Sequence, residues 1–371
     1  MKRMNILLAM FLSISINSYA DYFDTALKAY NKQQFVKAIE FYRKACYSGN
    51  AKGCCNLGVM HANGNGVKQN NVKAVKFYSL ACDGGNATGC FNLGVKYDIG
   101  EGVQQDDTKA VKFYSLACDG GDAGGCANLG TKYNNGEGVQ QDEFNAVKFY
   151  TLACDAGNAG GCANLGLLYS HSDDEAKQDK PTIFELFTKA CDGENAIGCL
   201  NLGLMYDKGD WVEQDTLKAF ELFTKACNSG SANGCLNLGI MHTKGKGVKP
   251  NNAKAVKFYS LACDGGNATG CFNLGVKYDI GEGVKQDDAK AVNFYSLACL
   301  GGDAIGCANL GNSYYDGEGV KQNKFKAYEF FKKACNGGYS GGCSNLEIMY
   351  STDNIIKPKV KKLLRKAYYS K

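Results

Sequence analysis

All but one of the 19 cysteines in this chain of 371 residues occur in pairs whose members are separated by seven residues. The pairs recur every 36 residues, apart from one interval of 37 between Cys154 and Cys191. Zinc sites use shorter C-x2–4-C spacings, usually with histidine, and only three histidines are present, so disulfides are favoured over a metal site. The predicted bridges are Cys46–Cys54, Cys82–Cys90, Cys118–Cys126, Cys154–Cys162, Cys191–Cys199, Cys227–Cys235, Cys263–Cys271, Cys299–Cys307 and Cys335–Cys343.

Cys55 is the cysteine left over, because Cys54 keeps the seven-residue spacing to Cys46. It occupies the position that Phe91 and Ala127 occupy in other repeats, which predicts a buried free thiol. The alternative is an intermolecular bridge or a reactive thiol.

An asparagine follows the second cysteine of every pair by two positions, off the apolar stripe of its helix. An amide both donates and accepts, so a row of amides suits the main chain of an extended peptide. Lys96 and Lys277, one turn later, would favour acidic ligands if they share the groove with the asparagines. The alternative is that each asparagine ties its own helix to a neighbouring turn. The candidate groove residues are Asn56, Asn92, Asn128, Asn164, Asn201, Asn237, Asn273 and Asn309.

Groups of residues arranged for catalysis are harder to find in this sequence than binding residues. The chain has no S-x-x-K, S-D-N or K-T-G sequence, the motifs of serine β-lactamases. His61 and His242 stand where other repeats have tyrosine, which predicts packing roles, and His171 falls in an irregular loop. We therefore expect no cofactor and no metal, and the sequence identifies no catalytic residue.

The elements that position these residues are pairs of helices. In the repeat from Asn86 to Gly121, Asn86 is a helix N-cap, and Cys90, Leu93 and Tyr97 then follow at helical spacing. Glycines at 100 and 102 break this helix, and a second one runs from Asp107 to Cys118. Each cysteine pair therefore spans the turn between the second helix of one repeat and the first helix of the next.

The ends of the chain differ from the repeats. Lys2, Arg3 and the apolar stretch after them predict a signal peptide over residues 1–20, cleaved after Ala20, and hence a secreted or periplasmic protein. We expect a helical pair over 21–49, eight repeats of 36 or 37 residues over 50–338, and a partial repeat with a basic capping helix over 339–371. No later segment is long and apolar enough to span a membrane. Removal of Lys2 and Arg3 with the signal peptide lowers the net charge from +5 by two, which is weak for nucleic-acid binding.

Two departures from the repeat are notable. Residues Ser170–Glu175 replace the glycine-containing turn of other repeats. Trp211 stands where other repeats have glycine, and we interpret it as either a binding anchor or a packing residue. Residues Lys73–Val103 are identical to Lys254–Val284, which indicates growth by duplication of whole modules.

The repeated pattern A-x2-C-x-N-L-G-x2-Y, followed by G-x-G-V and then K-A-x2-F-Y-x2-A-C, resembles the Sel-one-like repeats, relatives of the tetratricopeptide repeats. With a cysteine pair in each repeat and an export signal, the chain is similar to the Helicobacter cysteine-rich protein (Hcp) family. The resemblance implies an all-α, right-handed superhelical solenoid with a concave face. Members of that family are also classed as penicillin-binding proteins or weak β-lactamases.

The leading functional prediction is a secreted scaffold that holds a protein or peptide, from a host or the cell envelope, in a groove stiffened by disulfides. The alternative, which the family resemblance implies, is penicillin binding with weak β-lactam hydrolysis. A purely structural protein of the cell envelope is a third possibility.

Overall fold

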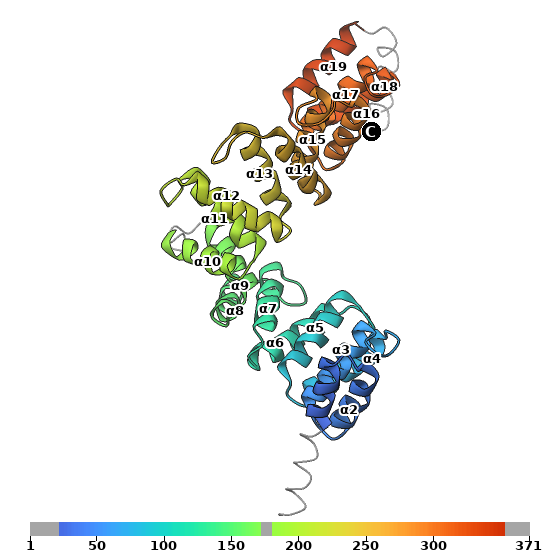
Figure 1. Ribbon diagram of the computed structural model, residues 1–371, viewed down its shortest axis with the longest axis vertical. Coiled ribbons are helices and arrows are strands. Elements are labelled where there is room, and N and C mark those ends of the chain that lie inside the picture. Colours follow the sequence, from blue (N-terminus) through green and yellow to red (C-terminus); the bar gives the residue numbers. More distant parts are fainter. Residues whose placement is uncertain (1–21, 172–179, 353–371) are drawn as a thin grey trace, which may run out of the picture. The chain divides into compact units, whose positions relative to one another are not determined.

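The computed structural model describes residues 22–171 and 180–352, and every regular element in them is a helix (Figure 1). The predicted signal peptide, most of the irregular stretch after Ser170, and the predicted basic capping helix lie outside the described residues. None of the described helices combines the length and the apolar character needed to cross a membrane.

Two kinds of helix alternate along the chain after a first helix over residues 22–31. The A helices, which carry the second cysteine of each pair, are α3 (Ala51–Asn63), α5 (Ala87–Ile99), α7 (Ala123–Asn135), α9 (Ala159–Ser170), α11 (Ala196–Lys208), α13 (Ala232–Lys244), α15 (Ala268–Ile280), α17 (Ala304–Asp316) and α19 (Ser340–Thr352). The B helices, which carry the first cysteine, are α2 (Phe35–Tyr47), α4 (Asn71–Asp83), α6 (Asp107–Asp119), α8 (Glu143–Asp155), α10 (Lys180–Asp192), α12 (Thr216–Asn228), α14 (Asn252–Asp264), α16 (Asp288–Leu300) and α18 (Lys324–Asn336).

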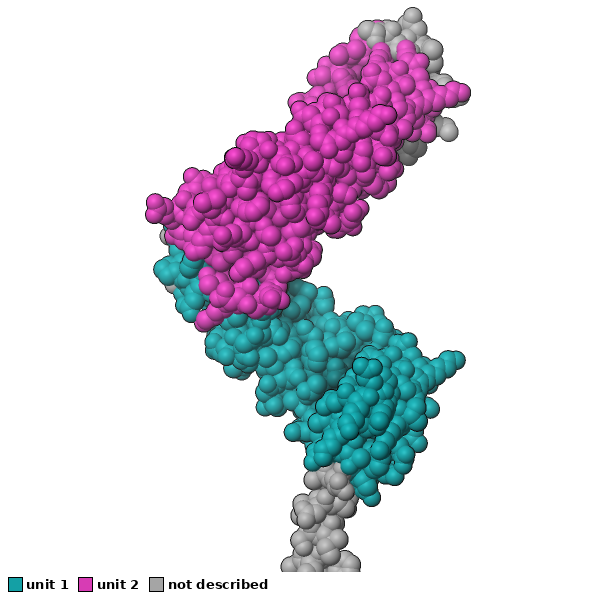
Figure 2. Space-filling view, in the orientation of Figure 1, with its two compact units in different colours: residues 1–186 teal, residues 187–371 magenta. Residues whose placement is uncertain are grey.

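The helices divide into two compact units, residues 1–186 and 187–371 (Figure 2). Consecutive helices pack against each other from α2 to α9 in the first unit and from α11 to α19 in the second, and some A helices of consecutive repeats also touch, such as α3 and α5 in the first unit and α13 and α15 in the second. This nearest-neighbour packing defines a solenoid, so the predicted all-α repeat architecture is confirmed.

Polar caps begin the helices where the sequence predicts them. The side-chain oxygen of Asn86 accepts a hydrogen bond from the N–H of Gly89 (2.7 Å) at the start of α5, and Asp106 caps α6 in the same way through Lys109 (3.0 Å). Gly100, with φ of 73°, ends α5 in the left-handed conformation that glycine adopts readily. Because caps and stops of this kind recur in most of the described repeats, these helix boundaries are set locally.

Aromatic rings and small residues interlock between the helices of a repeat. The ring of Tyr114 lies against Gly94, where a Cβ atom would come within 2.7 Å of the ring, so only glycine permits this close packing. Tyr97 stacks on Phe113 with ring centroids 5.5 Å apart. These contacts bury the ring of Tyr114 while its hydroxyl group reaches Asp98 on α5.

Candidate protein-binding surface

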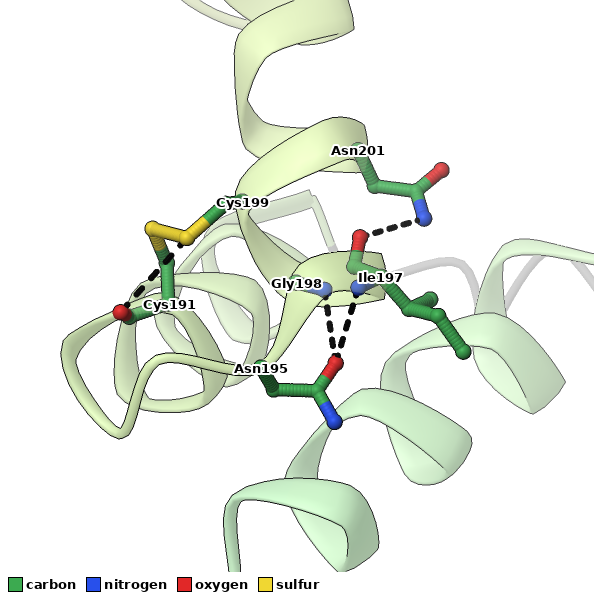
Figure 3. Close-up of a disulfide and its surroundings, with 6 residues drawn as sticks. All are labelled: Cys191, Asn195, Ile197, Gly198, Cys199 and Asn201. Carbon is green, nitrogen blue, oxygen red and sulfur yellow. Dashed lines mark hydrogen bonds between the residues drawn. A yellow bond between two sulfur atoms is a disulfide. The ribbon is translucent and has the colours of Figure 1, made fainter. Parts of the chain in front are cut away.

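Disulfides fix the joints between B and A helices. All nine predicted pairs are bonded in the structure, with Cα atoms 4.5–4.7 Å apart. Figure 3 shows Cys191–Cys199, which joins the last turn of α10 to the first turn of α11. There Asn195 accepts hydrogen bonds from the N–H groups of Ile197 and Gly198, both at 3.0 Å (Figure 3). The bridge and the cap together hold the turn in place.

The number of bridges bears on location. Disulfides form and persist in oxidising compartments and are rare in the cytosol. A chain with a bridge in every repeat therefore belongs outside the cytoplasm.

Cys55 is free and buried in the structure. Burial raises the pKa of its thiol, and its sulfur lies 3.9 Å from Nδ2 of Asn92 on the next A helix. A thiol that is both buried and protonated reacts slowly. The structure therefore favours a packing role over a reactive one for Cys55.

The candidate groove asparagines are all half-buried on the A helices. Asn201 illustrates their direction, since it points away from the disulfide of its own repeat (Figure 3). Its amide donates to the carbonyl oxygen of Ile197 (2.9 Å), one turn earlier in the same helix. Asn56, Asn128 and Asn309 instead interact with the buried tyrosine of the preceding B helix. For these four residues the structure supports the alternative interpretation, an amide that ties helices together.

Three of the candidate asparagines differ from the others. Among the described residues, no hydrogen-bond partner is found for the side-chain amides of Asn164, Asn237 and Asn273. Asn164 lies in the first unit, and the other two lie in the second. Their amides are the ones that an added peptide could engage without breaking a contact inside the protein.

Buried tyrosine hydroxyl groups make polar contacts between B and A helices. Tyr114 and Tyr295 donate to the carboxylates of Asp98 and Asp279, each at 2.9 Å. Burial, and then the neighbouring aspartate, raise the pKa of both tyrosines, so their hydroxyl groups stay protonated. The sequence feature that could have predicted these contacts is the recurrence of tyrosine four residues before the first cysteine of a pair.

The lysines predicted to attract acidic ligands are already neutralised. Lys277 is buried, and its ammonium group contacts Asn252 (2.9 Å) and Glu282 (2.6 Å). Lys96 contacts Asn71 and Glu101 in the same way. Partners within the chain therefore take up the charge and the donors of Lys96 and Lys277, which argues against a role for these lysines in attracting acidic ligands.

A cavity of about 660 Å³ opens in the first unit beside Asn164. Its described lining comes from α7, α8 and α9 and the loop between α7 and α8. Leu167 and Leu168 give it an apolar wall, and polar groups converge from Asn134, Gln141 and Tyr150. A space of this size with a mixed lining suits one or two side chains of a bound peptide.

His61 and His242 occupy packing positions, as predicted. They stack on Phe77 and Phe258 with centroid distances of 5.4 and 5.5 Å, where other repeats stack tyrosine on phenylalanine. Both rings are buried, and Nδ1 of each lacks a hydrogen-bond partner among the described residues. In that same part of the chain, no group of histidine, cysteine and acidic residues could hold a metal ion.

We expect these histidines to make the fold sensitive to acid. Burial lowers the pKa of His61 and His242, so below about pH 6.5 the unfolded chain takes up protons that the folded chain excludes. Stability is then unaffected above that pH and falls below it, by at most about 1.4 kcal/mol per pH unit for each histidine. The H61Y/H242Y variant, which restores the tyrosine of other repeats, should lose less stability between pH 7 and 5 in urea titrations; a loss equal to that of the wild type would contradict the assignment.

Trp211 is one of three non-glycine residues with a positive φ in the described part of the chain, together with Gln33 and Glu194. Its φ of 74° matches the values of 77° and 78° at Gly102 and Gly283, the residues at the same position in other repeats. The left-handed conformation is strained for an aromatic residue, by roughly 1–2 kcal/mol. The side chain is 41% exposed, which fits a contact residue better than a core residue.

Comparison with known proteins identifies the class to which this stacked, disulfide-bonded architecture belongs. A model of the Sel1 repeat matches residues 32–50, 51–86, 87–122, 123–158, 159–195, 196–231, 232–267, 268–303 and 304–339. The chain is a member of the Sel1 repeat family.

Particular relatives refine this assignment. HcpD of Helicobacter pylori, described as a candidate β-lactamase, is 36% identical over 69 residues, which span 17% of this chain and 22% of HcpD. The resemblance to Hcp proteins that the sequence predicted is thereby confirmed. A protective antigen of uropathogenic Escherichia coli has a similar structure (TM-score 0.61, 25% identity, 92% of this chain and 82% of that one). So has a Sel1 repeat protein of Oxalobacter formigenes (TM-score 0.59, 25% identity, 84% and 89%).

Proposed function

We propose that this protein is an exported repeat scaffold that binds an extended protein or peptide segment along its A helices. The observation that carries the proposal is the row of half-buried asparagines at one position of successive A helices, three of which keep unpaired amides among the described residues. An amide can both donate to and accept from a peptide main chain, whatever the peptide sequence.

The cavity beside Asn164 adds a place for an anchor. Its apolar wall at Leu167 and Leu168 would receive an aliphatic or aromatic side chain, while Tyr150 and Asn134 would meet polar groups at its rim. Buried anchors of this kind contribute most of the affinity at protein interfaces. Disulfides at every joint support the proposal, because a rigid binding surface loses less entropy when it binds.

Binding of a β-lactam is the second candidate, and its one support is the description of HcpD. That match covers about a fifth of HcpD, and the sequence has none of the S-x-x-K, S-D-N and K-T-G motifs of serine β-lactamases. Radiolabelled benzylpenicillin therefore serves as the competing ligand in the test of the scaffold.

We expect a peptide selected from a displayed library of random dodecapeptides to bind less tightly when the free amides are removed. Asn164→Ala and Asn237→Ala should each weaken binding by about two- to tenfold for a peptide that contacts that residue, the equivalent of one hydrogen bond. Melting temperatures should stay unchanged, because neither amide has a partner among the described residues. Fluorescence anisotropy of the labelled peptide measures the affinity.

The matched control is Asn293→Ala, an exposed asparagine on the B helix α16. It should leave affinity and stability unaltered. A stability loss in Asn164→Ala and Asn237→Ala as large as the binding loss would mean that the asparagines are structural. Stoichiometric retention of benzylpenicillin by the wild-type protein, with no peptide selected, would favour the β-lactam alternative.

A further inference from the structure

The outward faces of three consecutive B helices in the first unit carry the same row of exposed residues. On α4, α6 and α8 a lysine, a leucine and an aspartate follow each other at positions i, i+4 and i+7, which lie on one side of a helix. We call these nine residues the outer ridge. They are Lys76, Leu80 and Asp83 on α4, Lys112, Leu116 and Asp119 on α6, and Lys148, Leu152 and Asp155 on α8.

The outer ridge is exposed and its charges are unpaired. Leu80, Leu116 and Leu152 are 39%, 45% and 46% exposed, and the lysines and aspartates are exposed as well. Within the described residues, none of the six charged groups takes part in an ion pair, although each helix carries both signs. Lysine and aspartate seven positions apart on one helix are too distant to neutralise each other.

Other B helices show that this arrangement is not required by the fold. On α2 the lysine and leucine positions hold Glu40 and Lys44, which form an ion pair of 2.6 Å along the helix. Glutamate and lysine occupy the same two positions on α12 and α18. The same helix type can thus satisfy its own surface charge, whereas α4, α6 and α8 leave lysine, leucine and aspartate available.

We propose that the outer ridge is a self-association surface that pairs with the outer ridge of a second copy of this chain around a two-fold axis. Repetition places the lysines, leucines and aspartates in three parallel stripes, with leucine in the middle. A rotation of 180° about an axis that lies in the interface, along the leucine stripe, places Leu80, Leu116 and Leu152 of one copy over the same leucines of the other. It also brings the lysine stripe of one copy over the aspartate stripe of the other, so that Lys112 meets Asp119 of the second copy.

The spacing allows both contacts at once. Along a helix the lysine lies about 6 Å from the leucine and the aspartate about 4.5 Å on its other side, because each residue rises about 1.5 Å. The longer lysine side chain bridges the small difference. An interface whose surface is complementary to itself is the hallmark of two-fold dimers, which are the commonest soluble oligomers. The small apolar stripe points to a weak dimer whose orientation is set by charge.

The test uses two full-length charge-reversal variants, K76E/K112E/K148E and D83K/D119K/D155K. Sedimentation velocity of the wild type should show a monomer–dimer equilibrium that weakens as salt is added. Each variant alone places like charges face to face, so its dissociation constant should rise at least about tenfold. An equimolar mixture restores opposite charges in every contact, and it should associate again with roughly the affinity of the wild type.

The matched control is Lys257→Glu on α14. Lys257, Leu261 and Asp264 form the same row there, but α12 and α16 do not repeat it, so this variant should associate like the wild type. Circular dichroism verifies that every variant keeps its helices. The proposal would be overturned by a wild type that is monomeric at the highest soluble concentration, by charge-reversal variants that still dimerise, or by a mixture of these variants that does not dimerise. An effect of Lys257→Glu equal to that of the charge reversals would also overturn it. If a different protein binds the outer ridge instead of a second copy, the wild type will be monomeric, which is the first of these results.

Discussion

Replacing Cys118 and Cys126 together by alanine should lower the free energy of unfolding by about 2.5 kcal/mol. The bridge closes a loop of about nine residues, and the chain-entropy treatment assigns a loop of that length this stabilisation. It joins the end of α6 to the start of α7, in a cluster with Tyr114 and Leu129, so its loss loosens the packing of two consecutive repeats. Urea titrations of the two proteins measure the difference. Full reduction removes all nine constraints and should have the larger effect.

Cys55→Ala provides the control for loss of a buried sulfur without loss of a bridge. Alanine already occupies the equivalent position at Ala127 and Ala163, where it is buried, so the site accepts it. We expect a cost below about 1 kcal/mol, that of trimming one small buried group. If the double variant lost no more stability than Cys55→Ala, the bridges would not be the main constraint on the turns.

Replacing Lys132 by methionine should be as damaging as removal of a bridge, at about 3 kcal/mol. Lys132 on α7 is only 4% exposed, and its ammonium group forms ion pairs with Asp98 on α5, Asp107 on α6 (2.9 Å) and Glu137 in the following turn (2.8 Å). Burial lowers the pKa of Lys132, but the three carboxylates outweigh it and keep the lysine charged. Methionine keeps the bulk and leaves three carboxylates facing each other.

Lys109→Met is the matched control, since Lys109 pairs with Asp106 at the exposed start of α6 and should matter little. The effect of Lys132→Met should also depend on pH. The hydrogen bond from Lys132 lowers the pKa of Glu137, so the stabilisation is present above about pH 4.3 and is lost as the pH falls through the lower pKa of the folded state. Urea titrations at pH 7 and pH 3 should therefore show a smaller difference between wild type and Lys132→Met at pH 3. An equal difference at both pH values would mean that Lys132 acts only through packing.

Much of the fold could be read from the residues. The cap at Asn86, the stop at Gly100 and the bridge between Cys82 and Cys90 depend on residues at most eight positions apart, so their geometry is that of a helix and its ends. Because these features recur at a fixed period, the sequence predicted a stack of similar helix pairs, each joined to the next in the same way. The packing roles of His61 and His242 could be predicted as well, because tyrosine occupies their position elsewhere.

The candidate site was less accessible to sequence reasoning. Asn128 and Asn164 stand at the same position of the repeat, yet the first interacts with a buried tyrosine and the second keeps an unpaired amide among the described residues. Lys96 and Lys277 were expected to meet ligands, and they meet Glu101 and Glu282 instead. A side chain's partners depend on which rotamer the neighbouring repeat allows, and the repeat pattern contains no information about that choice.

By itself, the sequence determined the helix pairs, the caps, the cysteine pairs and the solenoid class, because each depends on short-range spacing that recurs along the chain. The tertiary structure decided which asparagine amides are available, which lysine charges are neutralised, and that the lysine–leucine–aspartate rows of α4, α6 and α8 are exposed. These properties depend on contacts between residues of different repeats, such as Lys132 with Asp98, 34 positions apart. Such contacts exist only once the helices have packed.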